Sequence, residues 1–173
     1  MDVAHLKKLA YEKMIANLDD MLKNYRQLLD LVRKEKDLLI TSNLELLNEN
    51  NNSKEQAIIK IKALDAIRIT YASELAHFVQ ADTAQPRLLE IAQKIGGAEG
   101  EKLRTMHAAL EMVIKRLSEI NKGNVQFAES ALKSVNSALD NFKDALTGPQ
   151  KTYQQKGKYK QASNSGNLVK REA

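Results

Sequence analysis

Apolar residues recur at spacings of three and four along most of the first 147 residues. This spacing places them on one face of an α-helix, and its mean of about 3.5 residues is typical of helices that pack as coiled coils. Glycine and proline, which end or weaken helices, number only 7 and 2 in 173 residues. The sequence therefore predicts an all-α protein, an elongated antiparallel coiled-coil-like bundle of three long helices with one short extra helix.

The first two long helices are predicted on either side of an asparagine-rich run. The first covers residues 3–47, and the run 48–52 is expected to break it. Ser53 and Gln56 have the spacing of a capping box, in which each side chain bonds a backbone N–H group at the start of a helix. A second helix is therefore expected over about residues 54–81.

Proline and glycine residues mark the remaining elements. Pro86 suits the first turn of a helix, because its missing N–H group is not needed there, and it predicts a short helix over 86–95. The glycine pair that follows and Gly100 are expected to form a loop. The last long helix then runs over about residues 101–146, and a Gly-Pro step stops it.

Charge divides the chain into two parts. The net charge of the whole chain is +5, and residues 148–173 carry all of it, so that the preceding residues are neutral. The same 26 residues show no sustained apolar period and are rich in polar residues. The sequence thus predicts two parts, a helical bundle over 1–147 and a flexible, disordered basic tail over 148–173.

Several classes of function find no support in the sequence. There is no cysteine, which excludes thiolate zinc sites and thiol catalysis. Glu74 and His77 form one E-x-x-H step, but a di-iron bundle needs that step on two helices, so no metal and no other cofactor is expected. No nucleophile elbow or phosphate loop occurs, which favours a protein that is not an enzyme. Without a secretory signal or a long apolar run, we expect a cytoplasmic protein that does not insert into membranes.

Polar residues interrupt the predicted apolar seams at three places. Asn121 and Asn124 lie on or beside the seam of the last helix, and Glu35 lies on the seam of the first. A polar residue at a seam commonly fixes the register of packed helices at some cost in stability. We interpret these three as structural, and a role facing a partner stays open.

The run EINKGNVQFAESALKSVNSAL in the last predicted helix resembles the last helix of the FlgN family of flagellar export chaperones. That helix carries paired asparagines, here Asn121 and Asn124, and then an apolar segment, here 130–132. The segment 28–39 and the Thr-Tyr step at 152–153 also resemble the family.

The resemblance implies a function and partners. FlgN proteins escort hook-associated (hook–filament junction) proteins to the flagellar export gate, bind their carboxy-terminal helices and prevent early assembly. We expect a monomer or a weak homo-oligomer, since an incompletely covered bundle could associate with itself through the surface that cargo would cover. Two alternatives remain: a generic helical adaptor or scaffold, which would bind away from the tail, and a nucleic-acid-associated protein acting through the basic tail. The cations of the tail are sparse, so no nucleic acid is expected.

The partner-binding site is expected at the end of the last helix and in the tail. The apolar stripe of that helix reaches the predicted disordered segment, so part of the stripe should stay uncovered until a partner arrives. The predicted partner-binding residues are Leu139, Phe142, Leu146, Tyr153, Leu168 and Val169.

Overall fold

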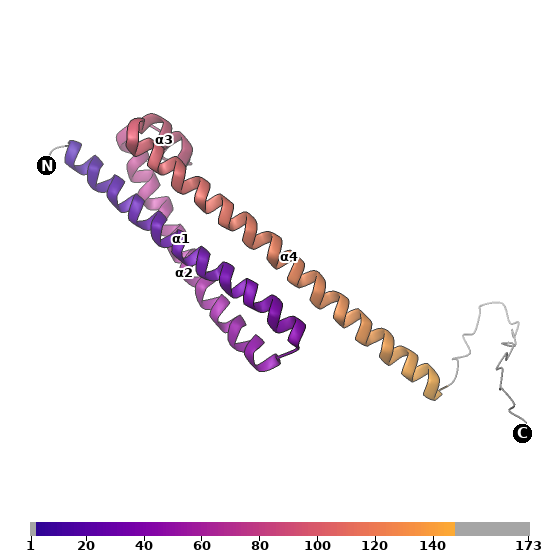
Figure 1. Ribbon diagram of the computed structural model, residues 1–173. Helices are drawn as coiled ribbons and strands as arrows, with labels where there is room; N and C mark the ends of the chain where they lie inside the picture. The colour runs from indigo at the N-terminus through magenta and orange to yellow at the C-terminus, as the bar shows by residue number, and fades with distance from the viewer. Residues whose placement is uncertain (1–2, 148–173) are drawn as a thin grey trace, which may run out of the picture. The chain divides into compact units, whose positions relative to one another are not determined.

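The structure is a computed structural model that describes the backbone of residues 3–147 and the side chains of residues 3–143. Four helices make up this part of the chain: α1 (Val3–Thr41), α2 (Leu44–Val79), α3 (Leu88–Ile95) and α4 (Gly97–Thr147) (Figure 1). The described residues include no strand. The prediction of an all-α fold with three long helices and one short helix is confirmed. The predicted tail, 148–173, lies outside the described residues.

The chain divides into two compact units, which are described separately. Unit 1 comprises Met1–Ala131 and contains α1, α2, α3 and the first part of α4. Unit 2 comprises Leu132–Ala173, of which the last turns of α4 are described.

Unit 1 is a bundle in which α2 runs antiparallel to both α1 and α4 (Figure 1). Its larger core lies near the start of α1, where Met14 packs with Leu75 of α2 and Leu103 of α4. A second, smaller core lies nearer the α1–α2 turn. It consists of Leu28, Val32, Ala57 and Ile61, with Leu117 and Ile120 of α4 half-buried against it. Apolar faces of three helices thus meet along the length of unit 1, as their spacing predicts.

The short helix α3 lies against the start of α4, and a glycine makes this approach possible. Ile91 and Ala92 of α3 are fully buried in the larger core. A Cβ atom on Gly100 would overlap the carbonyl oxygen of Ala92, so no other residue fits at this distance. The expectation that Gly100 belongs to a loop was wrong, because α4 already starts at Gly97. The short helix starts at Leu88, two residues later than predicted.

The turn between α1 and α2 lies earlier in the chain than predicted. Helix α1 ends at Thr41, and α2 starts at Leu44, so the asparagine-rich run 48–52 is helical. Ser53 does not cap a helix, because its hydroxyl donates to the Glu49 carbonyl within α2. Both the predicted break and the predicted capping box were therefore wrong.

Two residues at the turn satisfy the backbone groups that the helix ends leave free. Ser42 has a left-handed φ of 54°, and the N–H groups of Ser42 and Asn43 donate to the carbonyls of Leu39 and Leu38. This is the Schellman arrangement at the end of a helix. The Asn43 side chain then accepts from the Leu46 N–H group at 3.1 Å and caps α2. Asn43 therefore closes one helix and opens the next.

Candidate partner-binding surface

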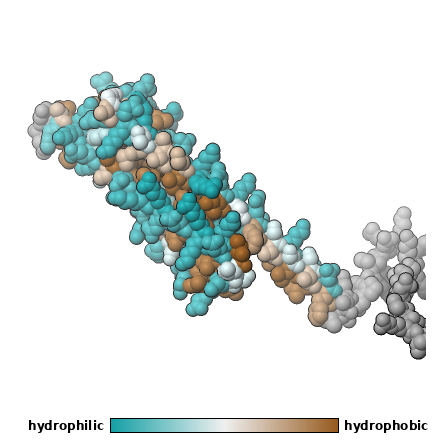
Figure 2. All heavy atoms as spheres, in the orientation of Figure 1, coloured by the Kyte–Doolittle hydropathy of each residue, from teal (hydrophilic) through white to brown (hydrophobic). Residues whose placement is uncertain are grey.

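The described part of unit 2 presents an uncovered apolar face. Leu132, Val135, Leu139 and Phe142 are spaced by three, four and three residues, so they lie on one side of α4. Each is more than half exposed, from 55% for Val135 to 64% for Phe142. Brown and tan atoms gather on the last turns of α4 in Figure 2. We call these four residues the unit 2 apolar face.

Polar residues fill the rest of this helix surface. The helix positions away from the unit 2 apolar face hold exposed polar residues, namely Lys133, Ser137, Asp140 and Asn141. A clean division of this kind is typical of a helix that packs against something on one side and meets water on the other. The described residues of unit 2 offer no such packing partner, because every side chain from Leu132 to Lys143 is exposed.

The chemistry available to this face is apolar association. Burying a large apolar side chain stabilises an interface by about 1.5–3 kcal/mol, and contiguous exposed apolar surface commonly marks a binding site. The four side chains carry no charge and no hydrogen-bonding group. A helix of another protein with an apolar stripe is therefore the type of ligand that matches this face.

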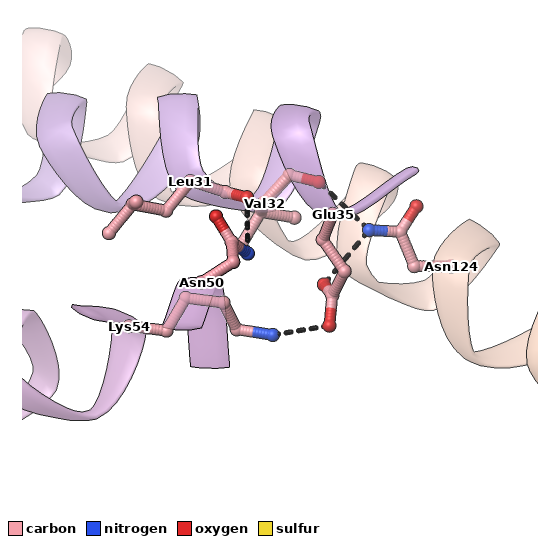
Figure 3. A network of polar contacts seen from close by, with 6 residues as sticks. All are labelled: Leu31, Val32, Glu35, Asn50, Lys54 and Asn124. Atoms are coloured by element: carbon pink, nitrogen blue, oxygen red, sulfur yellow. Dashed lines mark hydrogen bonds and ion pairs between the residues drawn. The ribbon is translucent and has the colours of Figure 1, made fainter. Parts of the chain in front are cut away.

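A polar network lies next to the smaller core of unit 1, toward the α1–α2 turn (Figure 3). The buried Asn124 side chain of α4 donates from Nδ2 to the Val32 carbonyl at 2.9 Å and to Glu35 Oε2 at 3.0 Å. The Lys54 ammonium of α2 lies 2.6 Å from Glu35 Oε1, and both side chains are mostly buried. One carboxylate thus links α1 to α2 and to α4.

Two further buried asparagines make similar contacts between α1 and α2. Asn50 Nδ2 donates to the Leu31 carbonyl at 3.1 Å, and Asn17 Nδ2 donates to the Leu64 carbonyl at 3.2 Å. Each bond joins a side chain of one helix to a backbone carbonyl of the other. Bonds of this type specify the register of neighbouring helices, since a sliding helix would lose them.

Hollows of two sizes lie on unit 1, and the smaller one borders the polar network at Asn124. The larger one, about 800 Å³, lies between the start of α1 and the end of α2, with Leu9 and Ile69 among its apolar lining residues. Glu74 and His77, the pair with E-x-x-H spacing, also line it. A smaller hollow, about 360 Å³, lies beside Gly123. In the part of the chain that the structure describes, no three His, Asp or Glu side chains are grouped so that they could hold a metal ion.

A protein-family model for the FlgN protein matches residues 1–161. The chain belongs to the FlgN family. FlgN proteins are flagellar export chaperones, not enzymes, so this chain has a chaperone role in flagellar protein export and flagellar proteins as partners. No curated protein and no solved structure gives a significant match. Within residues 3–147, none of the helices is long and apolar enough to cross a membrane.

The predicted partner-binding residues of this FlgN-family chain fall into two groups. Leu139 and Phe142 are exposed on the same side of α4, 59% and 64% respectively. Leu146 belongs to α4 by its backbone, and its side chain lies outside the described residues. A second group also lies outside the described residues and consists of Tyr153, Leu168 and Val169.

The predicted seam residues of the FlgN-family chain are placed differently from one another. Asn124 is 3% exposed and bonds to Glu35, so the structure brings these two together. Asn121 is exposed on α4 and does not take part in this network. Only one asparagine of the family's pair is therefore buried in unit 1.

Sequence reasoning missed two groups of residues in this FlgN-family chain. Asn50 and Lys54 continue the spacing of the buried α2 residues Ala57 and Ile61, but the predicted break at 48–52 concealed that spacing. Leu132 and Val135 precede Leu139 by seven and four residues, and the same spacing rule would have found them.

Proposed function

We propose that this chain binds the carboxy-terminal helices of hook-associated (hook–filament junction) proteins, keeps them from assembling early and delivers them to the flagellar export gate. The observation that supports this proposal is the unit 2 apolar face, uncovered in a chain of a flagellar export chaperone family. The chain would act in the cytoplasm by binding alone, without catalysis or a cofactor.

The physical reason lies in the nature of such cargo. Subunits that polymerise through helices expose apolar stripes before assembly, and such stripes aggregate unless they are covered. An amphipathic helix of the chaperone can cover one of these stripes by packing its own apolar face against it. The chaperone then prevents assembly because it occupies the surface that assembly needs.

The size of the unit 2 apolar face suits reversible binding. Four large side chains contribute about 1.5–3 kcal/mol each when they are fully buried. Association costs about 4–15 kcal/mol in lost translational and rotational freedom, so this face alone gives no more than modest affinity. Delivery requires release, and a face of this size is compatible with both steps.

The segment that follows α4 is proposed to contribute a second contact. Tyr153, Leu168 and Val169 supply apolar groups within a basic segment, and they would close over the cargo or dock on the export gate. Deleting residues 148–173 should weaken binding to the cargo, to the gate protein or to both. Unchanged affinity for both proteins would contradict this role for the segment.

A single substitution with a matched control tests the proposal. Leu139→Glu places a charge in the unit 2 apolar face, and Ser137→Glu places the same charge on the opposite side of α4. We expect Leu139→Glu to weaken binding to a purified hook-associated protein at least about tenfold in calorimetry, because a charge would be buried without a partner. Ser137→Glu should change the affinity less than about twofold. Equal affinities of the two variants would refute the proposal.

A further inference from the structure

Two segments of α4 carry the same pattern of residues, but only one of them is buried. Residues 103–113 read LRTMHAALEMV, and residues 132–142 read LKSVNSALDNF. Eight positions correspond in the two segments. In order, they hold a leucine, a basic residue, a small hydroxyl residue, an apolar residue, an alanine, a leucine, an acidic residue and an apolar residue. The two segments are 29 residues apart, and we call them the buried copy and the exposed copy.

The buried copy shows what this pattern packs against. Leu103 is 0% exposed and Leu110 is 8% exposed, and both belong to the larger core, to which α1 and α2 contribute along its length and the short helix α3 contributes at its end. Ala109 is packed against the same core. Because successive residues turn by about 100° around a helix, Leu103 and Ala109 mark the edges of an apolar arc of about 120°. An arc of this width faces two neighbouring helices at once, whereas a two-stranded seam is narrower.

The exposed copy has an arc of the same width. Leu132 and Ala138 are six residues apart, as Leu103 and Ala109 are, so they also lie about 120° apart around the helix. Val135, Leu139 and Phe142 lie between these edges. Leu132 is 62% exposed and Leu139 is 59% exposed, where the matching leucines of the buried copy are covered.

We propose that the exposed copy binds a pair of helices of the exported partner and packs between them as the third helix of a shared core. This inference rests on the proposed function for the identity of the partner. It adds that the ligand is two adjacent amphipathic helices, and that the ligand takes the place that α1 and α2 have for the buried copy. Ala138 then lies inside the interface, since its counterpart Ala109 is packed against the core of unit 1.

A second copy of this chain is a poor ligand for the same face. The pair of helices that a second copy could offer is α1 and α2, and Leu103 and Leu110 of that copy are already buried in the core that these helices form. Binding there would require this part of α4 to leave its own core. The pair of helices is therefore expected to come from a different protein.

A substitution at Ala138, on the edge of the arc, distinguishes binding to a pair of helices from binding to a single helix. Against a single helix, Ala138 would flank the seam, where coiled coils commonly carry Glu. Against a pair, a Glu at this position would be buried without a partner. Ala138→Glu in the full chain should therefore weaken binding to a purified hook-associated protein at least about tenfold, whereas Ser137→Glu should change the affinity less than about twofold. Circular dichroism of both variants checks that α4 stays helical.

Hydrogen exchange of the hook-associated protein gives an independent result. On binding, amide exchange should slow in two separate helical segments of that protein. Slower exchange in one segment alone would overturn the inference and leave the proposed function standing. The same holds if Ala138→Glu binds the hook-associated protein with full affinity while Leu139→Glu binds it more weakly. Full affinity of both variants would overturn the proposed function as well. Sedimentation of the full chain alone provides a further test, because a dimer that Ala138→Glu abolishes would show that a second copy is the ligand.

Discussion

Asn124 donates a hydrogen bond of 3.0 Å to Glu35, across 89 positions of sequence, and so joins the last helix of the bundle to the first. The same Nδ2 group also donates to the Val32 carbonyl, and Lys54 lies against the other oxygen of Glu35. Among the described side chains Asn124 is the last buried one of α4, and every side chain from Val125 to Lys143 is exposed. These bonds therefore lie at the last position of α4 whose described side chain is buried.

Asn124→Ala should lower the free energy of unfolding by about 1–3 kcal/mol, because Glu35 and the Val32 carbonyl lose a buried donor. Asn121→Ala is the matched control, since Asn121 is exposed three residues earlier on the same helix. Both variants gain the same helix propensity, because each replaces an asparagine by an alanine within α4. The difference between their free energies of unfolding therefore gives the contribution of the polar network. Urea denaturation measures both values. A loss of equal size in the two variants would show that the network contributes nothing.

Gly100 and Gly123, both inside α4, should respond in opposite directions to alanine. Gly100→Ala should destabilise the bundle by at least about 2 kcal/mol, because its Cβ would collide with the Ala92 backbone. Gly123→Ala should stabilise it by up to about 1 kcal/mol, since its Cβ would enter open space on a helix. Thermal unfolding of the two variants checks this contrast. The same sign for both would contradict the close approach of α3 and α4.

Ser42→Gly should stabilise unit 1 by up to about 1 kcal/mol, because Ser42 holds a left-handed φ that glycine adopts without a steric penalty. Lys34→Gly, at an exposed helical position of α1, should instead destabilise it by about 1 kcal/mol. Urea midpoints of both variants test this pair. A destabilised Ser42→Gly variant would contradict the turn at residues 41–44.

Two tyrosines should make the stability fall at alkaline pH. Burial raises the pKa of Tyr25 above its usual value, and the nearby Asp65 carboxylate adds to this effect. Burial likewise raises the pKa of Tyr11, and the Glu99 carboxylate adds to it. In the window between the usual and the raised pKa, the unfolded chain loses these protons before the folded chain does. The contribution of the two tyrosines to the free energy of unfolding is therefore fully present below about pH 10. It declines as the pH rises through their raised pKa.

The double variant Tyr11→Phe with Tyr25→Phe removes these two groups and should show a smaller alkaline decline. The parent protein and the variant share their lysines, so the background from lysine ionisation cancels in the comparison. Free energies of unfolding at about pH 8 and about pH 10.5 provide the measurement. An equal decline in both proteins would contradict the raised pKa values.

The spacing of apolar residues was sufficient to predict the helices, but not every place where they end. The turn at Ser42 has neither glycine nor proline, and Gln80, at the end of α2, also holds a left-handed φ without being glycine. Residues of these types give no sequence signal for a helix end. The run 48–52 reads as a break by composition, yet Asn50 is buried there and bonds to α1. Tertiary packing overrides local propensity at these positions.

The candidate site could be predicted only in part, for a different reason. Spacing alone identified Leu139 and Phe142 as members of an apolar stripe. Spacing does not show whether such a stripe is covered, because the same pattern is buried at 103–113 and exposed at 132–142. The expectation that the end of the stripe stays uncovered came instead from the polar segment that follows it in the sequence. Periodicity identifies a face that needs a partner, and only the three-dimensional arrangement shows whether the chain supplies one.

Site-specific photocrosslinking in flagellated cells can identify which side of α4 contacts the exported partner. A photoreactive phenylalanine at Phe142 lies in the unit 2 apolar face, and the same group at Asn141 lies at the next position, on the polar side of α4. We predict that the probe at Phe142 crosslinks to a hook-associated protein, identified by mass, and that the probe at Asn141 does so far less. Crosslinks of equal yield from both positions, or none to a hook-associated protein from Phe142, would contradict this prediction.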